Sequence, residues 1–171
     1  GVNDRVVIFS PDASVYAIVA SHGDEILSRP MGVTFDRAGR LWIADTGHRR
    51  LAACEADGSW SRTLPVSTSA EGGEDFTDLA LSTDERFAFV VDNQQHHLVR
   101  VDLTSGAGAV IGSAGAARWQ FDHPFLIAAD GRGSLCVSDV INGRVGLWQE
   151  DGTCNGVAGS FGVEPGQLYR P

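Results

Sequence analysis

The chain has 171 residues, of which 43% are hydrophobic and 20% are charged, a balance typical of a folded domain. Its formal net charge of −9 repels phosphate backbones, so we expect no nucleic-acid partner. No apolar run is long enough to cross a bilayer, and we therefore expect no membrane insertion. The first residue is not Met, which suggests a processed or truncated polypeptide.

The three cysteines, Cys54, Cys136 and Cys154, are scattered and show no CxxC spacing of the kind that binds metals. Their odd number favours buried free thiols over a disulfide framework, with a single Cys136–Cys154 bridge as the alternative. Free thiols favour an intracellular, reducing compartment.

The sequence repeats itself with a period of 47 residues. The residues that keep this period are aspartates at 45, 92 and 139 and prolines at 30, 124 and 171. Within one period, short apolar runs alternate with polar turns, and the runs are too short for helices. Four short strands at this spacing predict a blade of a β-propeller.

We expect an all-β fold of four-stranded antiparallel blades, about three and a half in number, in one propeller domain. The expected segments are 1–30, the outer half of a blade and a linker; 31–75, 76–122 and 123–160, three whole blades; and 161–171, the lead-in to a further blade. Closed propellers have roughly four to eight blades, so these residues do not close a ring. We expect them to belong to a larger ring of six blades, completed by the same chain or by another.

The most complete copy of the repeat lies at residues 30–51. It reads Pro-x-Gly-[apolar]-x-[apolar]-Asp-x-x-Gly-x-[apolar]-x-[apolar]-Ala-Asp-Thr-Gly-x-x-Arg-[apolar], and weaker copies lie at 92–98 and 139–145. This pattern resembles the NHL repeat. The resemblance implies a β-propeller; for function it implies protein binding, RNA binding or one of a few enzymatic activities.

Each repeated aspartate is followed five residues later by a basic residue. The pairs are Asp45 with Arg50, Asp92 with His97, and Asp139 with Arg144. We interpret them as structural pairs that hold the turn between the second and third strands, because a group repeated in every blade serves a need of every blade. The alternative is a ring of charges at one mouth of the channel.

Residues that break the repeat are better candidates for binding. They lie in two neighbouring turns and before the third blade: His48, Arg49, Gln95, His96, Trp119 and His123. Zinc requires ligands about 2.0–2.1 Å away, and we expect adjacent turns to be too far apart for that. The simpler interpretation of these histidines is exposure in turns.

The chain lacks the motifs of nucleotide-binding proteins, serine hydrolases and HExxH metalloproteases. We therefore expect no catalytic residue, no metal and no cofactor, with calcium at Glu71, Glu74 and Asp75, or zinc, as alternatives. The expected function is a non-catalytic protein-interaction or scaffold module, a subunit or fragment of a larger assembly. The alternative is a metal-dependent enzyme, similar to the amidating lyases of the NHL family or to a hydrolase, with its site at the channel mouth.

Overall fold

The structure is a computed structural model that describes residues 3–22, 24–68 and 75–171. Within these ranges it is built of β-strands, with one short 3-10 helix, η1 (Thr46–His48), after the second strand of the first whole blade. No helix in the described ranges has the length and apolar character that crossing a membrane requires. The all-β prediction is confirmed.

Three antiparallel sheets of four strands follow one another along the chain. The first contains β5 (Pro30–Phe35), β6 (Leu41–Asp45), β7 (Arg50–Cys54) and β8 (Trp60–Pro65). The second contains β9 (Phe76–Leu81), β10 (Phe87–Asp92), β11 (His97–Asp102) and β12 (Gly108–Ile111). The third contains β13 (Pro124–Ala129), β14 (Ser134–Asp139), β15 (Arg144–Gln149) and β16 (Cys154–Ala158). In each sheet the strands pair in chain order, as in a propeller blade.

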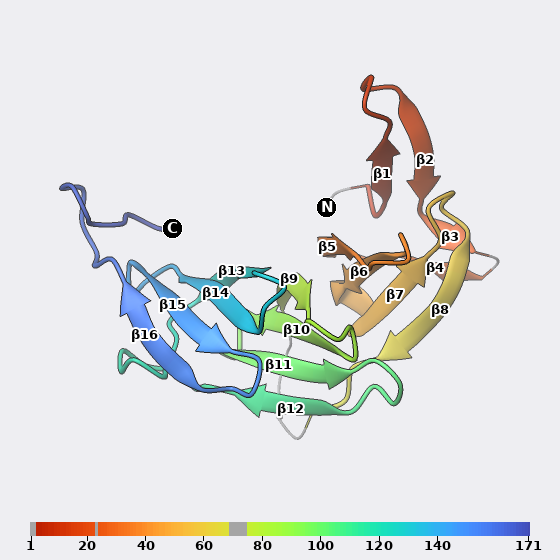
Figure 1. Cartoon of the computed structure of the whole chain (residues 1–171). Coiled ribbons are helices and arrows are strands. Elements are labelled where there is room, and N and C mark those ends of the chain that lie inside the picture. Colours follow the sequence, from red (N-terminus) through yellow and green to blue (C-terminus); the bar gives the residue numbers. More distant parts are fainter. Residues whose placement is uncertain (1–2, 23, 69–74) are drawn as a thin grey trace.

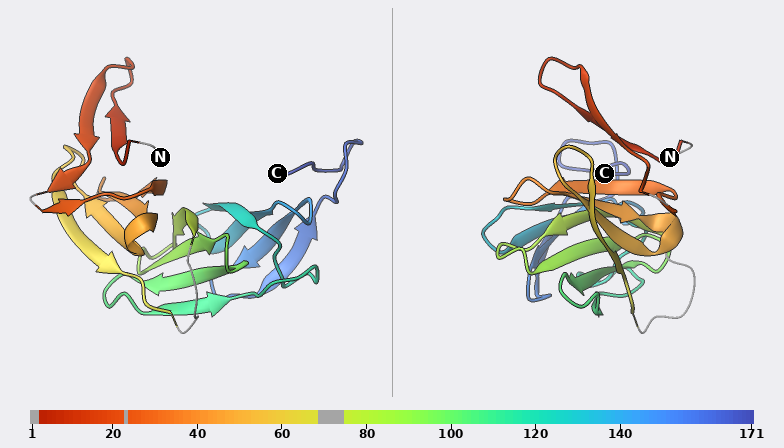
Figure 2. Two further views of the ribbon diagram at one scale, coloured as in Figure 1. Left: turned by 180° about the vertical axis from the view of Figure 1, so that it is seen from behind. Right: turned by 90° about the vertical axis from the view of Figure 1, so that its right-hand side faces the viewer.

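The hairpin of β1 (Val6–Phe9) and β2 (Val15–Val19) is the half blade at the start of the arc. The blades form an open arc in which β5, β9 and β13 lie on the concave side, and the ends of the arc stay apart (Figure 1). Figure 2 shows the same open arrangement from two further directions. The predicted three and a half blades are therefore present.

A second hairpin, β3 (Ser21–His22) and β4 (Glu25–Ile26), lies where the sequence predicted only a linker. It forms because its end is anchored: the Leu27 amide donates to the Ala20 carbonyl over 2.9 Å, and the Leu27 side chain is buried. Strands of two residues leave almost no periodic signal in a sequence, which explains the miss.

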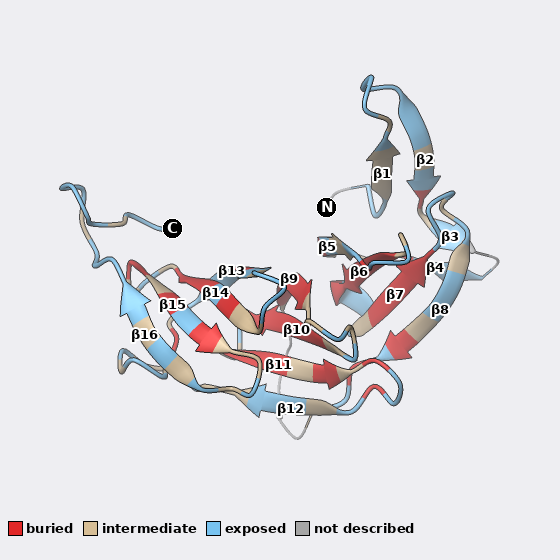
Figure 3. Ribbon diagram, in the orientation of Figure 1, coloured by how far each residue is buried: buried red, intermediate tan, exposed pale blue. Residues whose placement is uncertain are grey.

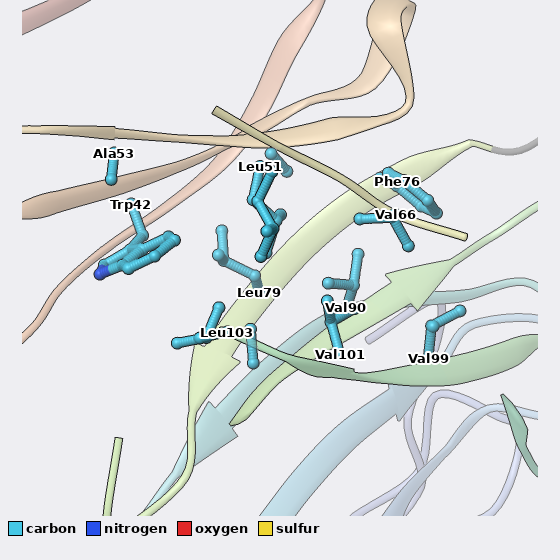
Figure 4. Packing of buried hydrophobic residues seen from close by; sticks show 13 residues of the cluster. Trp42, Leu51, Ala53, Val66, Phe76, Leu79, Val90, Val99, Val101 and Leu103 are labelled. Atoms are coloured by element: carbon cyan, nitrogen blue, oxygen red, sulfur yellow. The ribbon is translucent and has the colours of Figure 1, made fainter. Parts of the chain in front are cut away.

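The core lies between blades. Because side chains alternate along a strand, the middle strands of the first two sheets bury one face against the blade before and the other against the blade after (Figure 3). Between the first and second whole blades, Trp42 and Leu51 pack in one cluster with Leu79, Val90 and Val101 (Figure 4). Similar clusters join the other neighbouring blades.

A buried carboxylate closes the turn between the second and third strands of the first whole blade. Asp45 Oδ1 accepts the backbone N–H of Ser28 over 2.6 Å, which ties the start of the blade to its centre. Asp45 Oδ2 accepts from Arg50 Nε over 2.7 Å and lies 2.9 Å from His48 Nδ1. The side chain of Asp45 is fully buried, so all its interactions are with protein groups.

The third blade repeats this arrangement. Asp139 accepts the backbone N–H of Asp122 over 2.7 Å, Arg144 Nε over 2.8 Å and Asn142 Nδ2 over 2.8 Å. Arg144 also donates to the carbonyls of the loop before the blade, those of Ala116, Ala117 and Gln120. One ion pair thus organises both a turn and a loop.

We predict that Asp45→Ala lowers the free energy of unfolding by about 1–3 kcal/mol, because the Ser28 N–H and Arg50 Nε lose their buried acceptor while Arg50 keeps its ion pair with Glu25. Urea unfolding measures the change. The control is Asp57→Ala: Asp57 is exposed and accepts only from Ser59, so the loss there should stay below about 1 kcal/mol. Equal losses in the two variants would contradict the structural role of Asp45.

Candidate functional site

Two histidines and an aspartate meet where the second and third whole blades join. His96 lies in the turn between β10 and β11, and Asp122 and His123 directly precede β13. The two imidazole rings pack edge to face with their centroids 4.4 Å apart. Asp122 Oδ1 lies 2.7 Å from His123 Nδ1 and 3.5 Å from His96 Nδ1. We name these three residues the junction cluster.

The sequence predicted that adjacent turns lie too far apart for a metal site. The turn that contains His96 and the segment before β13 lie close enough. A ligand-capable atom of each residue in the junction cluster lies within 4.8 Å of the other two. The reason is a direct contact between the blades, in which the backbone N–H of His123 donates to His96 Nδ1 over 3.0 Å. The sequence pattern contains no sign of this contact, because it joins two different repeats.

The backbone of this contact is common to the repeat. Between the half blade and the first whole blade, the N–H of Arg29 donates to Asp4 Oδ1 over 2.7 Å in the same way. Asp4, Arg29, His96 and His123 all have positive φ angles, between 42° and 55°. The left-handed backbone is thus a general feature of these segments, and the imidazole side chains are what distinguishes this junction.

The other predicted binding residues lie elsewhere. His48 contacts the buried Asp45, and the equivalent Asn142 contacts Asp139 in the same manner, so His48 is part of the turn's hydrogen-bond network. Gln95 donates its backbone N–H to Asp92 over 3.1 Å, and the carbonyl of Arg49 accepts the N–H of Val66.

Trp119 is exposed in the loop before β13, with 59% of its surface accessible. The ring that His123 packs against is His96. Of the predicted calcium ligands, Glu71 and Glu74 lie outside the described residues, and Asp75 forms an ion pair with Arg29 over 2.7 Å. All three cysteines are free thiols, as the sequence predicted, but Cys54 is the one that is buried; Cys154 is half-buried, and Cys136 is exposed because its blade has no neighbour on that side.

A carboxylate that the sequence analysis missed lies on the concave wall. Asp78, on β9, lines a cavity of about 440 Å³ together with residues of β5 and β13. By strand register its equivalents in the other blades are Gly32 and Leu126, so a carboxylate occurs here in the second blade alone among the three described sheets. The signal was present as a polar residue inside an apolar run, but an added residue in the following turn hid the alignment.

Asp78 links two blades. Its Oδ2 accepts the backbone N–H of Ile127 over 2.9 Å, and its Oδ1 accepts that of Leu79 over 2.9 Å. Burial raises the pKa of the Asp78 carboxyl, and the two backbone donors partly oppose this rise. The cavity wall around it is mixed, with the exposed Val33 and Phe35 beside the charged Arg37 and Glu85.

Two further side-chain hydrogen bonds join the second blade to the start of β13. Thr77 Oγ1 donates to the Phe125 carbonyl over 2.7 Å, and Asn93 Nδ2 donates to the Pro124 carbonyl over 2.9 Å. The beginning of β13 is therefore fixed against the second blade on both sides of the junction cluster.

The pair in the second blade differs from those in its neighbours. His97 Nε2 lies 3.8 Å from Asp92 Oδ2, too far for a hydrogen bond, and within the described residues neither atom has a hydrogen-bond partner. Imidazole is shorter than the guanidinium found at this place in the other blades. Burial lowers the pKa of His97, and the nearby Asp92 carboxylate opposes this only in part.

No protein-family model matches the chain. Human NHL repeat-containing protein 3 is 35% identical over 66 residues, which are 35% of this chain and 18% of that protein. A catalytically inactive variant of virginiamycin B lyase from Staphylococcus aureus, solved with quinupristin, has a TM-score of 0.67 at 16% identity, over 90% of this chain and 48% of that one. A chain of a nidogen/laminin complex has a TM-score of 0.66 at 16% identity, over 98% of this chain and 59% of that one.

These likenesses define the class of protein as a β-propeller. The repeat at residues 30–51 and the 66-residue similarity to the human NHL repeat-containing protein agree with a propeller of the NHL type. It spans about half the length of the solved structures and less than a fifth of the curated relative.

We predict that the free energy of unfolding falls as the pH is lowered from about 7.5 to about 5.5, with His97 as one cause. The folded state lowers the pKa of His97 below its ordinary 6.5, so the unfolded state binds the proton more readily in this range. The stability present above pH 6.5 is therefore lost as the pH falls toward the folded pKa. Urea unfolding at several pH values should show a shallower dependence for His97→Gln; equal slopes would exclude His97 as a cause.

Proposed function

We propose that the chain is a non-catalytic protein-interaction module, and that a further propeller blade covers its third whole blade. The proposal rests on one observation. The face of β14 and β15 that is turned away from the second blade exposes Cys136 and Leu147, at positions where the first blade buries Trp42 and Ala53 against the second. The covering blade comes from the same polypeptide or from another.

The repeat allows a direct comparison of equivalent positions. Phe89 is fully buried between the second and third blades, and its equivalent Cys136 is exposed. Ala53 is fully buried, and its equivalent Leu147 is 38% exposed. Cys136 also lines an apolar hollow of about 310 Å³ on this face. Such a contiguous apolar surface marks an interaction site, and here its shape suits a neighbouring blade.

The opposite end of the arc has a surface of the same type. Phe9 on β1 is 60% exposed, and its equivalent Cys54 is fully buried. The inner edge of β1 also has unpaired backbone groups, because β1 pairs only with β2. Both ends therefore favour contact with a further propeller blade, as in a larger ring of six blades.

The polar groups of the arc favour binding over catalysis. The repeated aspartates of the first and third blades are occupied by backbone and guanidinium donors, and Asp78 accepts two backbone N–H groups. A general base or nucleophile requires a free lone pair directed at a substrate. We expect these carboxylates to serve the fold.

The test is sedimentation of the chain over the micromolar range. We expect concentration-dependent association through the uncovered blade faces, and we expect Leu147→Glu to reduce it, because a charge on the docking face must be desolvated. The matched control is Val110→Glu, at an exposed valine on the outer strand of the second blade, which should associate like the unaltered chain. A stable monomer with protected strand edges in hydrogen exchange would contradict the proposal.

The alternative function is a metal-dependent enzyme of the NHL type, similar to an amidating lyase or a hydrolase, at the channel mouth. The junction cluster is the observation that favours it, since two imidazoles and a carboxylate are common zinc ligands. Metal-dependent turnover that His123→Arg abolishes, at unchanged thermal stability, would favour this alternative over the binding module.

A further inference from the structure

We infer that the junction cluster binds one divalent transition-metal ion, with His96, Asp122 and His123 as its protein ligands. The inference is independent of the interaction function proposed above. It requires only that the two blades meet as the structure shows, and it assigns to this junction a chemistry that the other described junctions lack.

The donor atoms have the spacing that a tetrahedral ion needs. Bonds of about 2.0–2.1 Å place neighbouring ligands of zinc about 3.3 Å apart. His96 Nδ1 and Asp122 Oδ1 are 3.5 Å apart, and His123 Nδ1 and Asp122 Oδ1 are 2.7 Å apart. Small side-chain rotations are therefore sufficient, and the ion takes the place of the proton shared by His123 and Asp122.

The chemistry of the donors selects the class of ion. Two imidazole nitrogens and one carboxylate oxygen suit Zn²⁺, Co²⁺ or Ni²⁺, whereas Ca²⁺ and Mg²⁺ prefer oxygen alone. Three protein ligands leave a fourth position for water or for a group of a partner. The side chains of Asp122 and His123 are 36% and 51% exposed, so an ion can reach them from solvent.

The backbone that carries the ligands is already fixed. The N–H of Asp122 donates to the buried Asp139 over 2.7 Å, and the carbonyl of Pro124, one residue after His123, accepts from Asn93. Little chain entropy is lost on binding when ligands are held in this way. His96 Nδ1 accepts the His123 N–H over 3.0 Å, so the ion displaces this hydrogen bond when it takes the lone pair.

The repeat itself indicates that the cluster is not needed for folding. The place of His123 is taken by Arg29 and by Arg170, both with the same left-handed backbone. The place of His96 is taken by Arg49 and Gly143, again with positive φ. The ion pairs of Asp122 in this structure are with the two histidines, whereas Asp75, at the matching place in the second blade, pairs with Arg29.

The test is titration of the chain with Zn²⁺ by calorimetry, in a background of Cys136→Ser and Cys154→Ser that removes competing thiols. We expect one Zn²⁺ ion per chain. A Co²⁺ titration should give a tetrahedral spectrum without sulfur charge transfer. Mg²⁺ and Ca²⁺ at the same concentrations should leave the melting temperature unchanged.

Three variants locate the ion. His123→Arg places at this position the residue found at Arg29 and Arg170, and His96→Asn keeps an oxygen that accepts the His123 N–H; each should weaken Zn²⁺ binding by on the order of 100-fold. The control His48→Asn copies Asn142 and should bind Zn²⁺ like the unaltered chain. The inference is overturned if the unaltered chain shows no saturable binding, or if the first two variants bind as tightly as the control.

Discussion

Burial of each sheet between two neighbours is the constraint on which this structure depends. All five residues of β6 and five of the six residues of β10 are buried, so these strands have no solvent face at all. A blade of this composition is not stable alone, because its apolar side chains need sheets on both sides. The same constraint explains the two ends of the arc, where residues such as Leu147 keep the apolar character of an interior position while facing solvent.

Polar pairs then set the geometry that burial leaves undetermined. Apolar packing is non-directional. Asp45 and Asp139 supply direction within their own blades, because each carboxylate joins the start of its blade, a turn and a basic side chain at once. The second blade has the weaker pair of Asp92 and His97, and its contacts with the third blade are supplemented by Asp78, Thr77 and Asn93.

Much of the fold was predictable because the same pattern of apolar runs and turns occurs in three blades, so each copy supports the interpretation of the others. The period predicted the four-stranded antiparallel blades, and it singled out Asp45, Asp92 and Asp139. The candidate site was less predictable. His96 and His123 were recognised as exceptions, but their contact depends on how one blade leans on the next, and a sequence period contains no information about that angle.

A residue that departs from the repeat is informative about function only when the replacement changes the chemistry of its position. His48 differs from the equivalent Asn142, yet each side chain contacts the buried aspartate of its blade, so the same interaction is kept. At the junction cluster the departure changes the chemistry: an arginine, which stays charged and cannot bind a metal, gives way to an imidazole beside a carboxylate. Asp78, a carboxylate that bridges to β13, lies at the same pair of blades. Among the described blades, the departures that change the chemistry of the repeat are therefore concentrated at the junction of the second and third whole blades.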